Sequence, residues 1–146
     1  MIAIRVDGNP KIGLGHIMRS LSIAVKIKSF NVPCFFICAE DNAGTEIIRQ
    51  KGFEALVLHS QWDHLASEIK PLADLIQNKN VELILIDSYC VSEAYLSEIK
   101  KLVRLAYIDD LNAFIYPCDI LINYAKYSEK YSYAENYPDT VLLQGP

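Results

Sequence analysis

A histidine, an arginine and two glycines follow the first apolar segment of the chain at a spacing suited to ligand binding. The segment 2–7 is followed by a turn that contains Gly13 and Gly15, and His16 and Arg19 come directly after that turn. Glycines let the backbone pass close to a ligand, and the start of a helix offers free N–H groups and a positive dipole end. A neutral imidazole at the mouth of a sheet can act as a general base, with capping or packing of the turn as the alternative role for His16.

The glycine turn differs from the two common nucleotide-binding motifs. Met18 stands where a dinucleotide fingerprint has its third glycine, and the loop from the strand is too long for that motif. A P-loop would need Gly-Lys-Ser or Gly-Lys-Thr, which does not follow here. The spacing of His16 and Arg19, three residues apart, instead predicts two neighbouring side chains on the first turns of a helix.

Aspartates follow several of the expected strands. Asp7 ends the first apolar segment, Asp87 ends another, and Asp109 and Asp110 follow a third. Ligands of open parallel sheets bind at the carboxyl ends of strands, where the strand order reverses. We therefore expect Asp87 and Asp109 at the ends of adjacent or near-adjacent strands, close to the glycine turn. A helix N-cap or a turn is the structural alternative for each aspartate.

Short apolar runs alternate with longer amphipathic segments along the chain. The run 81–87 is apolar at almost every position, which is typical of a parallel strand covered by helices on both faces. The pattern predicts one α/β domain over residues 1–146, a doubly wound parallel sheet of the Rossmann-like type. Expected strands span 2–7, 32–39, 54–59, 81–87, 104–108, 120–123 and 141–143, and expected helices span 15–30, 44–51, 62–78 and 92–102, with Pro71 either kinking the third helix or starting a second one.

Composition narrows the class of partner. The net charge of −4 argues against nucleic acid as the main partner. Basic residues nevertheless outnumber acids over 1–30, which indicates either a solvated helix face or a positive rim for an anionic ligand. No apolar run reaches the roughly 18 residues of a membrane span and no export signal is visible, so we expect a cytoplasmic protein.

The four cysteines do not form a metal or disulfide framework. Cys34 and Cys38 share one face of an expected strand, and Cys90 and Cys118 are isolated. Zinc sites need closely paired thiols and a second pair of ligands. The sequence therefore predicts buried free cysteines, as in a reducing compartment, and no metal site.

Five motifs in order resemble one family, the UDP-sugar hydrolases of pseudaminic acid biosynthesis and their relatives described as spore coat polysaccharide biosynthesis proteins. The resemblance runs through essentially the whole chain and is far more specific than any single motif. The motifs are Arg5-x-Asp7-Gly8, Ile12-Gly13-x-Gly15-His16-x-x-Arg19, Ile86-Asp87-Ser88-Tyr89, Ile108-Asp109-Asp110, and Cys118-Asp119 with Asn123.

The resemblance implies the N-terminal half of a GT-B architecture, in which two Rossmann-like domains face a cleft. The second, UDP-binding domain would follow Gly145-Pro146 and is absent from this chain. The implied reaction is hydrolysis of a UDP-linked diacetamido-trideoxy sugar, without metal or cofactor, by water that His16 activates. The implied substrate contacts come from Asp7, Gly13, Gly15, Arg19, Asp87, Tyr89, Asp109 and Asn123.

Other functions remain open from the sequence. Many relatives have a histidine where this chain has Tyr116-Pro117, which leaves the exact sugar open. A GT-B glycosyltransferase uses a similar glycine turn with histidine, and a standalone sugar-binding module is a non-enzymatic alternative. A receiver-type signalling domain would need an acidic pair after the first strand and a lysine after the fifth, neither of which is present.

Arg5, on a central strand, is expected to pair with a carboxylate, since an unpaired buried charge is costly.

Overall fold

The computed structural model describes residues 1–145 and contains one parallel sheet of seven strands. The strand order is β3-β2-β1-β4-β5-β6-β7, and every neighbouring pair is parallel. This arrangement confirms the predicted doubly wound α/β fold. The strands are β1 (Ile2–Val6), β2 (Cys34–Cys38), β3 (Ala55–Val57), β4 (Leu83–Asp87), β5 (Arg104–Ile108), β6 (Ile120–Asn123) and β7 (Val141–Gln144).

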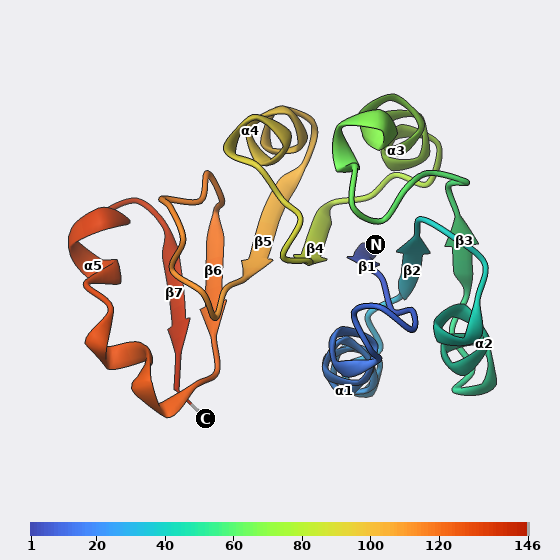
Figure 1. The fold of residues 1–146 in the computed structure, drawn as a ribbon, viewed down its shortest axis with the longest axis horizontal. Coiled ribbons are helices and arrows are strands. Elements are labelled where there is room, and N and C mark those ends of the chain that lie inside the picture. Colours follow the sequence, from blue (N-terminus) through green and yellow to red (C-terminus); the bar gives the residue numbers. More distant parts are fainter. Residues whose placement is uncertain (146) are drawn as a thin grey trace.

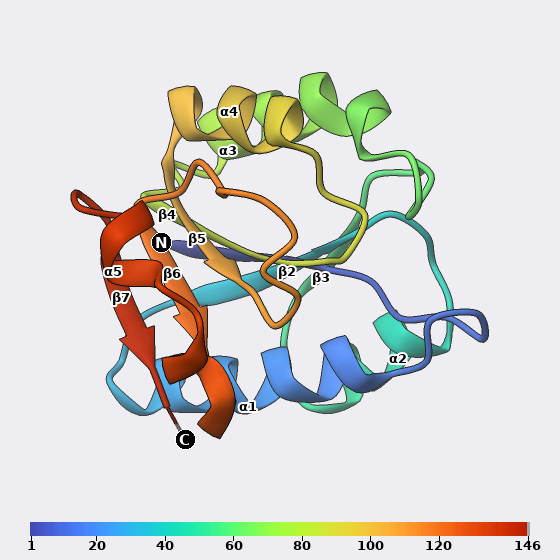
Figure 2. The same ribbon diagram turned by 60° about the vertical axis from the view of Figure 1, so that its left-hand side comes forward.

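Helices cover both faces of the sheet. α1 (Gly15–Ser29) and α2 (Ala43–Gln50) lie on one face, whereas α3 (Ile69–Asn78) and α4 (Glu93–Leu102) lie on the other (Figures 1 and 2). Near the β7 edge, the 3₁₀ helix η2 (Lys126–Lys130) and the short helix α5 (Tyr133–Asn136) complete the fold. The connection between β6 and β7 was not expected to contain helices.

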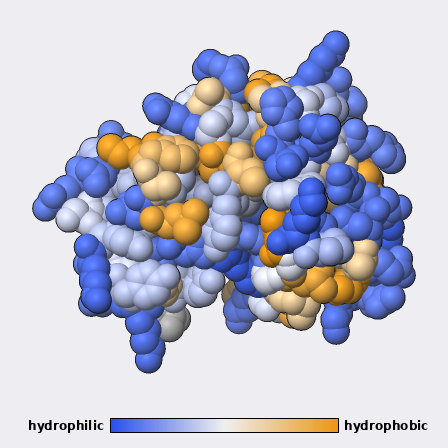
Figure 3. Space-filling model, in the orientation of Figure 1, coloured by the Kyte–Doolittle hydropathy of each residue, from blue (hydrophilic) through white to orange (hydrophobic). Residues whose placement is uncertain are grey.

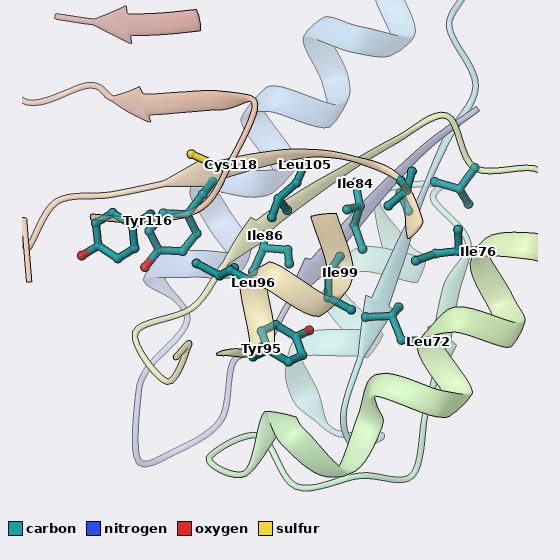
Figure 4. Close-up of a cluster of buried hydrophobic side chains, with 14 of the residues drawn as sticks. Leu72, Ile76, Ile84, Ile86, Tyr95, Leu96, Ile99, Leu105, Tyr116 and Cys118 are labelled. Atoms are coloured by element: carbon teal, nitrogen blue, oxygen red, sulfur yellow. The ribbon is translucent and has the colours of Figure 1, made fainter. Parts of the chain in front are cut away.

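Alternating side chains of the strands build two cores. On β4, Ile84 and Ile86 join the cluster under α3 and α4, whereas Leu85 joins the cluster under α1 and α2. Figure 4 shows the first cluster, in which Leu72 of α3 and Leu96 of α4 pack over the sheet residues. Because successive side chains of a strand point to opposite faces, position along each strand decides which helix layer a residue meets.

The order of the strands reverses beside β1. The chain runs from β1 outward through β2 to β3, then returns to place β4 on the other side of β1. Loops that leave the carboxyl ends of β1 and β4 therefore diverge to opposite sides and leave a crevice between them. The glycine turn follows β1 and Asp87 ends β4, so both lie at this switch point.

Several element boundaries differ from those predicted. The third predicted helix, 62–78, begins at residue 65 as the 3₁₀ helix η1 (Leu65–Glu68) and continues as α3, with Pro71 in the first turn of α3. Proline fits there because the first turn has no intrahelical partner for its missing N–H.

A buried ion-pair network fixes η1 against β1, as was expected for Arg5. The guanidinium of Arg5 donates hydrogen bonds from Nε and Nη2 to the Glu68 carboxylate, each 2.7 Å long. A third donor, Nη1, binds Asp7, and the Tyr95 hydroxyl donates to Glu68 at 2.7 Å. Arg5 and Glu68 are fully buried, so each charge depends on the other for its stability.

The cysteines are free, as predicted, but only two of the four are buried. All four cysteines are free thiols, with Cys38 and Cys118 buried and Cys34 and Cys90 half-buried. On the face seen in Figure 3, apolar patches are separated by hydrophilic side chains. Within residues 1–145, no helix is both long and apolar enough to cross a membrane.

Replacing Glu68 by alanine should strongly destabilise the fold, because it leaves the Arg5 guanidinium buried without its main partner. Breaking a buried pair in this way costs about 3–5 kcal/mol. Urea unfolding would measure the loss. Glu98→Ala, which removes the exposed pair with Lys101, is the matched control and should change stability little. A Glu68→Ala protein as stable as the wild type would contradict the central role of this network.

Candidate active site

The turn between β1 and α1 is shaped by its own hydrogen bonds and by glycines. The Asn9 side-chain oxygen accepts from the N–H groups of Lys11 and Ile12, and the Asn9 carbonyl accepts from Gly13. Gly13 has a φ of +75°, which favours glycine. A Cβ at Gly8 would lie 2.5 Å from the side chain of Ile17, so glycine is also needed there for α1 to pack. This turn therefore sets where α1 begins and where His16 projects.

His16 of α1 and Asp87 of β4 form a buried pair across the switch point. Nδ1 of His16 lies 2.6 Å from Oδ1 of Asp87. The Asp87 side chain is fully buried, and the His16 side chain is 9% exposed. The Asp87 carboxylate also accepts hydrogen bonds from Arg19, through Nε at 2.6 Å and through Nη2, and from the Ser20 hydroxyl. Three residues of the first turns of α1 thus converge on one carboxylate.

The charge on Asp87 determines the tautomer of His16. Burial alone would raise the pKa of Asp87, but the hydrogen bonds from Arg19 and His16 outweigh burial and lower the pKa below its ordinary value of 3.8. An ionised carboxylate accepts hydrogen bonds and cannot donate them, so Nδ1 of His16 must carry the hydrogen. Arg19 Nη2 lies 3.0 Å from Nδ1, but it cannot donate a hydrogen bond to a ring nitrogen that already carries a hydrogen. In neutral His16 the lone pair is therefore on Nε2. This nitrogen has no hydrogen-bond partner among residues 1–145, and it is not one of the fully buried polar atoms that lack a partner.

Two residues that the sequence analysis did not place in the site meet Arg19. Its Nη1 donates to Asp110 at 2.9 Å and to the Tyr124 hydroxyl at 3.0 Å. The Tyr89 hydroxyl donates to the same Asp110 oxygen at 2.7 Å. Burial and the hydrogen bond to Asp110 raise the pKa of Tyr89 to about 12, so the phenol stays protonated. Strand alternation beyond β5 could have indicated Asp110, because it follows Ile108 by two positions and so faces α1.

His16 lines two neighbouring spaces, an open cleft and a small cavity. The cleft has a volume of about 320 Å³. It is lined by Gly15, Arg19 and Tyr124 and by three residues that it shares with the cavity. Asp7 and Asp87 contribute to the cavity wall. The three shared residues are Ile12, His16 and Tyr89. His16 and Tyr89 meet edge to face, with ring centroids 4.5 Å apart.

The remaining predicted site residues lie in other hydrogen-bonded groups. Asp109 does follow the strand next to β4, as expected, but its carboxylate accepts from the N–H groups of Leu111 and Asn112 and from the Tyr133 hydroxyl. Asn123 is fully buried and donates to Tyr133 at 3.0 Å. These contacts place Asp109 and Asn123 under α5, outside the residues that line the cleft and the cavity.

The basic residues near the N-terminus do not form a continuous positive rim. Arg5 is buried and Arg19 is paired with carboxylates. Lys26 and Lys28 lie in the last turn of α1, where they complement the negative end of the helix dipole. Lys11, beside Trp62, is the basic group near the cavity wall. The structure thus favours the interpretation as a helix face over that of an anion-binding rim.

Across residues 1–145, no three or more histidine, cysteine or acidic side chains are grouped so that they could hold a metal ion.

Comparison with known proteins supports the fold. No protein-family model matches the chain. The sequence is similar to the uncharacterized protein MJ1062 of Methanocaldococcus jannaschii, with 29% identity over 152 residues that cover 99% of this chain and 29% of that protein. The structure is similar to MurG of Acinetobacter baumannii, with a TM-score of 0.68 and 7% identity over 84% of this chain and 40% of MurG. The chain spans less than half the length of either, and at this identity the structural likeness shows a shared Rossmann-like fold.

Asp87→Asn should flatten the dependence of stability on acid pH. The folded-state pKa of Asp87 lies below 3.8, so its stabilising contribution is present above that value and lost as pH falls through the folded-state pKa. Below about pH 4, the unfolding free energy of the wild type should therefore fall more steeply than that of Asp87→Asn. Urea unfolding at a series of pH values measures both slopes. The exposed Asp74→Asn is the control and should keep the wild-type slope; equal slopes for all three proteins would contradict the pairing of Asp87.

Proposed function

We propose that this domain is the sugar-binding and catalytic half of an enzyme that hydrolyses a nucleotide-linked sugar. The observation that carries the proposal is the pair of His16 and Asp87 at the switch point, with Nε2 of His16 left without a hydrogen-bond partner among residues 1–145. A carboxylate that holds one imidazole nitrogen fixes the tautomer and orients the other nitrogen as a base. The cleft beside His16 has the volume expected of a small-molecule site.

The arrangement fits attack of water on an anomeric carbon. Nε2 of His16 takes a proton from water while the new C–O bond forms, and the bond between the anomeric carbon and the phosphate oxygen breaks. The nucleoside diphosphate leaves with the electron pair of that bond, and attack from the opposite side inverts the anomeric centre. Asp87 stabilises the imidazolium that results, because its negative charge lies 2.6 Å from Nδ1.

The main role of Arg19 is to hold Asp87 in place. Its guanidinium is spread over Asp87, Asp110 and Tyr124, which leaves little donor capacity for a diphosphate. We infer that the diphosphate and the nucleoside are bound by a second domain that faces this cleft, as in a GT-B architecture. The sugar would contact Gly15, Tyr89 and the exposed face of Arg19.

The resemblance of the sequence motifs supports a more specific substrate. The UDP-sugar hydrolases of pseudaminic acid biosynthesis act on a UDP-linked diacetamido-trideoxy sugar, and the residues of their motifs include His16, Asp87 and Tyr89 here. We propose this sugar class for the enzyme that contains the domain. Asp7 belongs to the same motif set, and its position in the cavity wall supports a role next to the bound sugar.

A glycosyltransferase is the second candidate, favoured by the likeness of the fold to part of MurG, a GT-B glycosyltransferase. Both reactions use a base beside the anomeric carbon, and they differ in the nucleophile. A sugar-binding module without catalysis would need no oriented base, so the pairing of His16 with Asp87 argues for an enzyme.

His16→Asn, made in the protein that joins this domain to its nucleotide-binding half, should lower turnover about 10²–10⁴-fold, the usual contribution of a general base. Substrate affinity should stay within a few-fold of the wild type, because the base acts mainly in the transition state. The assay is release of UDP from the UDP-linked sugar, with circular dichroism to check folding. His64→Asn, an exposed histidine away from the cleft, is the control. Unchanged turnover in His16→Asn would place the base elsewhere.

The hydrolase and the transferase differ in their need for an acceptor. A hydrolase should release UDP at the same rate with and without sugar acceptors, and the product should be the free sugar. The measurement is UDP release with and without a mixture of mono- and oligosaccharide acceptors, with NMR of the sugar product. UDP release that requires an acceptor, with a glycoside as product, would replace the hydrolase by the transferase.

A further inference from the structure

We propose that the small cavity behind His16 binds a single water molecule, and that this water is the nucleophile of the reaction. The inference rests on the proposed function and specifies where the attacking oxygen is held. Asp7, Ser88, Cys90 and Trp62 line the cavity away from the open cleft. None of Ser88, Cys90 and Trp62 belongs to the site residues named from the sequence.

The size of the cavity fits one water and excludes a larger nucleophile. The volume open to the centre of a water molecule is about 20 Å³. A cavity needs roughly 10–15 Å³ by this measure to hold one water molecule. A sugar hydroxyl could act as the nucleophile from this position only if the sugar ring that carries it also entered the cavity. The cavity therefore selects water by size.

The cavity wall offers polar partners that a bound water requires. Ser88 is 8% exposed, and its Oγ accepts from the Cys90 N–H while its hydroxyl hydrogen has no acceptor among residues 1–145. Each Asp7 oxygen accepts one hydrogen bond, Oδ1 from the Ala39 N–H and Oδ2 from Arg5, and so keeps a lone pair. His16 also lines the cavity, and its Nε2 is the ring nitrogen that Asp87 does not engage.

Together these groups account for a water in a reactive orientation. The water accepts a hydrogen bond from Ser88 and donates its two hydrogens to Asp7 and to Nε2 of His16. Ordered buried waters make about three hydrogen bonds, which this set provides. One lone pair of the water oxygen remains for attack on carbon.

His16 lies on the wall that the cavity and the cleft share, with Ile12 and Tyr89. A sugar in the cleft and a water in the cavity would therefore meet beside His16. As the oxygen attacks the anomeric carbon, the hydrogen bonded to Nε2 passes to the imidazole, and the diphosphate leaves with the electrons of the broken C–O bond. The second hydrogen stays on the oxygen and becomes part of the new hydroxyl group.

The water site can be tested on residues 1–146 without substrate. Crystal structures at about 1.5 Å resolution should show an ordered water within hydrogen-bond distance of Ser88 Oγ and His16 Nε2. Cys90→Leu should fill the cavity and remove that water, and Ser88→Ala should lower its occupancy without filling the space. Cys34→Leu, a half-buried cysteine on β2 that lines neither space, is the matched control and should retain it.

The nucleophile is tested in the full enzyme with the UDP-linked sugar and methanol. Wild-type enzyme in aqueous methanol should give free sugar and almost no methyl glycoside. Cys90→Ala enlarges the cavity and should raise the share of methyl glycoside at least several-fold, whereas Cys90→Leu should lower UDP release at least tenfold. Cys34→Leu should match the wild type in both rate and product.

The outcomes separate this inference from the proposed function. A water in the crystal structure with no UDP release by the enzyme would leave the cavity site standing and remove the hydrolase. An active hydrolase whose rate and products are unchanged in Cys90→Leu, Cys90→Ala and Ser88→Ala would overturn the cavity as the source of the nucleophile. If Cys90→Leu does not fold, the product ratio of Cys90→Ala and the rate of Ser88→Ala decide.

Discussion

The Asp87 carboxylate is the interaction on which the geometry of the site depends. It ends a central strand, and it accepts hydrogen bonds from His16, Arg19 and Ser20, which all belong to the first turns of α1. Arg19 extends the contact to Asp110 beyond β5 and to Tyr124 beyond β6. One buried negative charge thus joins α1 to the ends of three strands. Charge-assisted hydrogen bonds of this kind are directional, so the imidazole of His16 is held in one orientation.

The sheet keeps two sets of buried charges apart. Arg5 points to the layer of η1 and α4, where it binds Glu68, whereas Asp87 points to α1 on the opposite face. Asp7, at the end of β1, belongs to the first set and also reaches the cavity beside His16. The Arg5 network therefore holds an acidic group in the cavity wall, and the Asp87 network holds an oriented imidazole there. Neither set can shift without leaving a charge unpaired in the protein interior.

The sequence predicted the sheet well because strand signals are local. Apolar runs and the order of strand and helix were enough to place the strands of the sheet and to bring His16, Arg19 and Asp87 to one edge. The helix 62–78 was wrong at its start because composition does not reveal that Glu68 must turn inward to meet Arg5. The different surroundings of Asp109 and Asp110 follow from alternation: Asp110 lies on the side of α1, whereas Asp109 lies on the side of Tyr133. Tyr124 and Trp62 come from loops whose paths depend on tertiary packing, and no pattern in the sequence indicates where they lie.

The charges near His16 favour one half of the proposed reaction. The carboxylates of Asp7, Asp87 and Asp110 lie on this side of the molecule, and the guanidiniums of Arg5 and Arg19 that pair with them have most of their donors engaged. Such surroundings stabilise positive charge that develops at an anomeric carbon and disfavour a diphosphate at the same place. In the function that we propose, other groups hold the diphosphate, across the cleft from His16. The proposed division of a nucleotide sugar between two domains agrees with this electrostatic constraint, because one set of charges cannot stabilise both the cationic sugar and the departing anion.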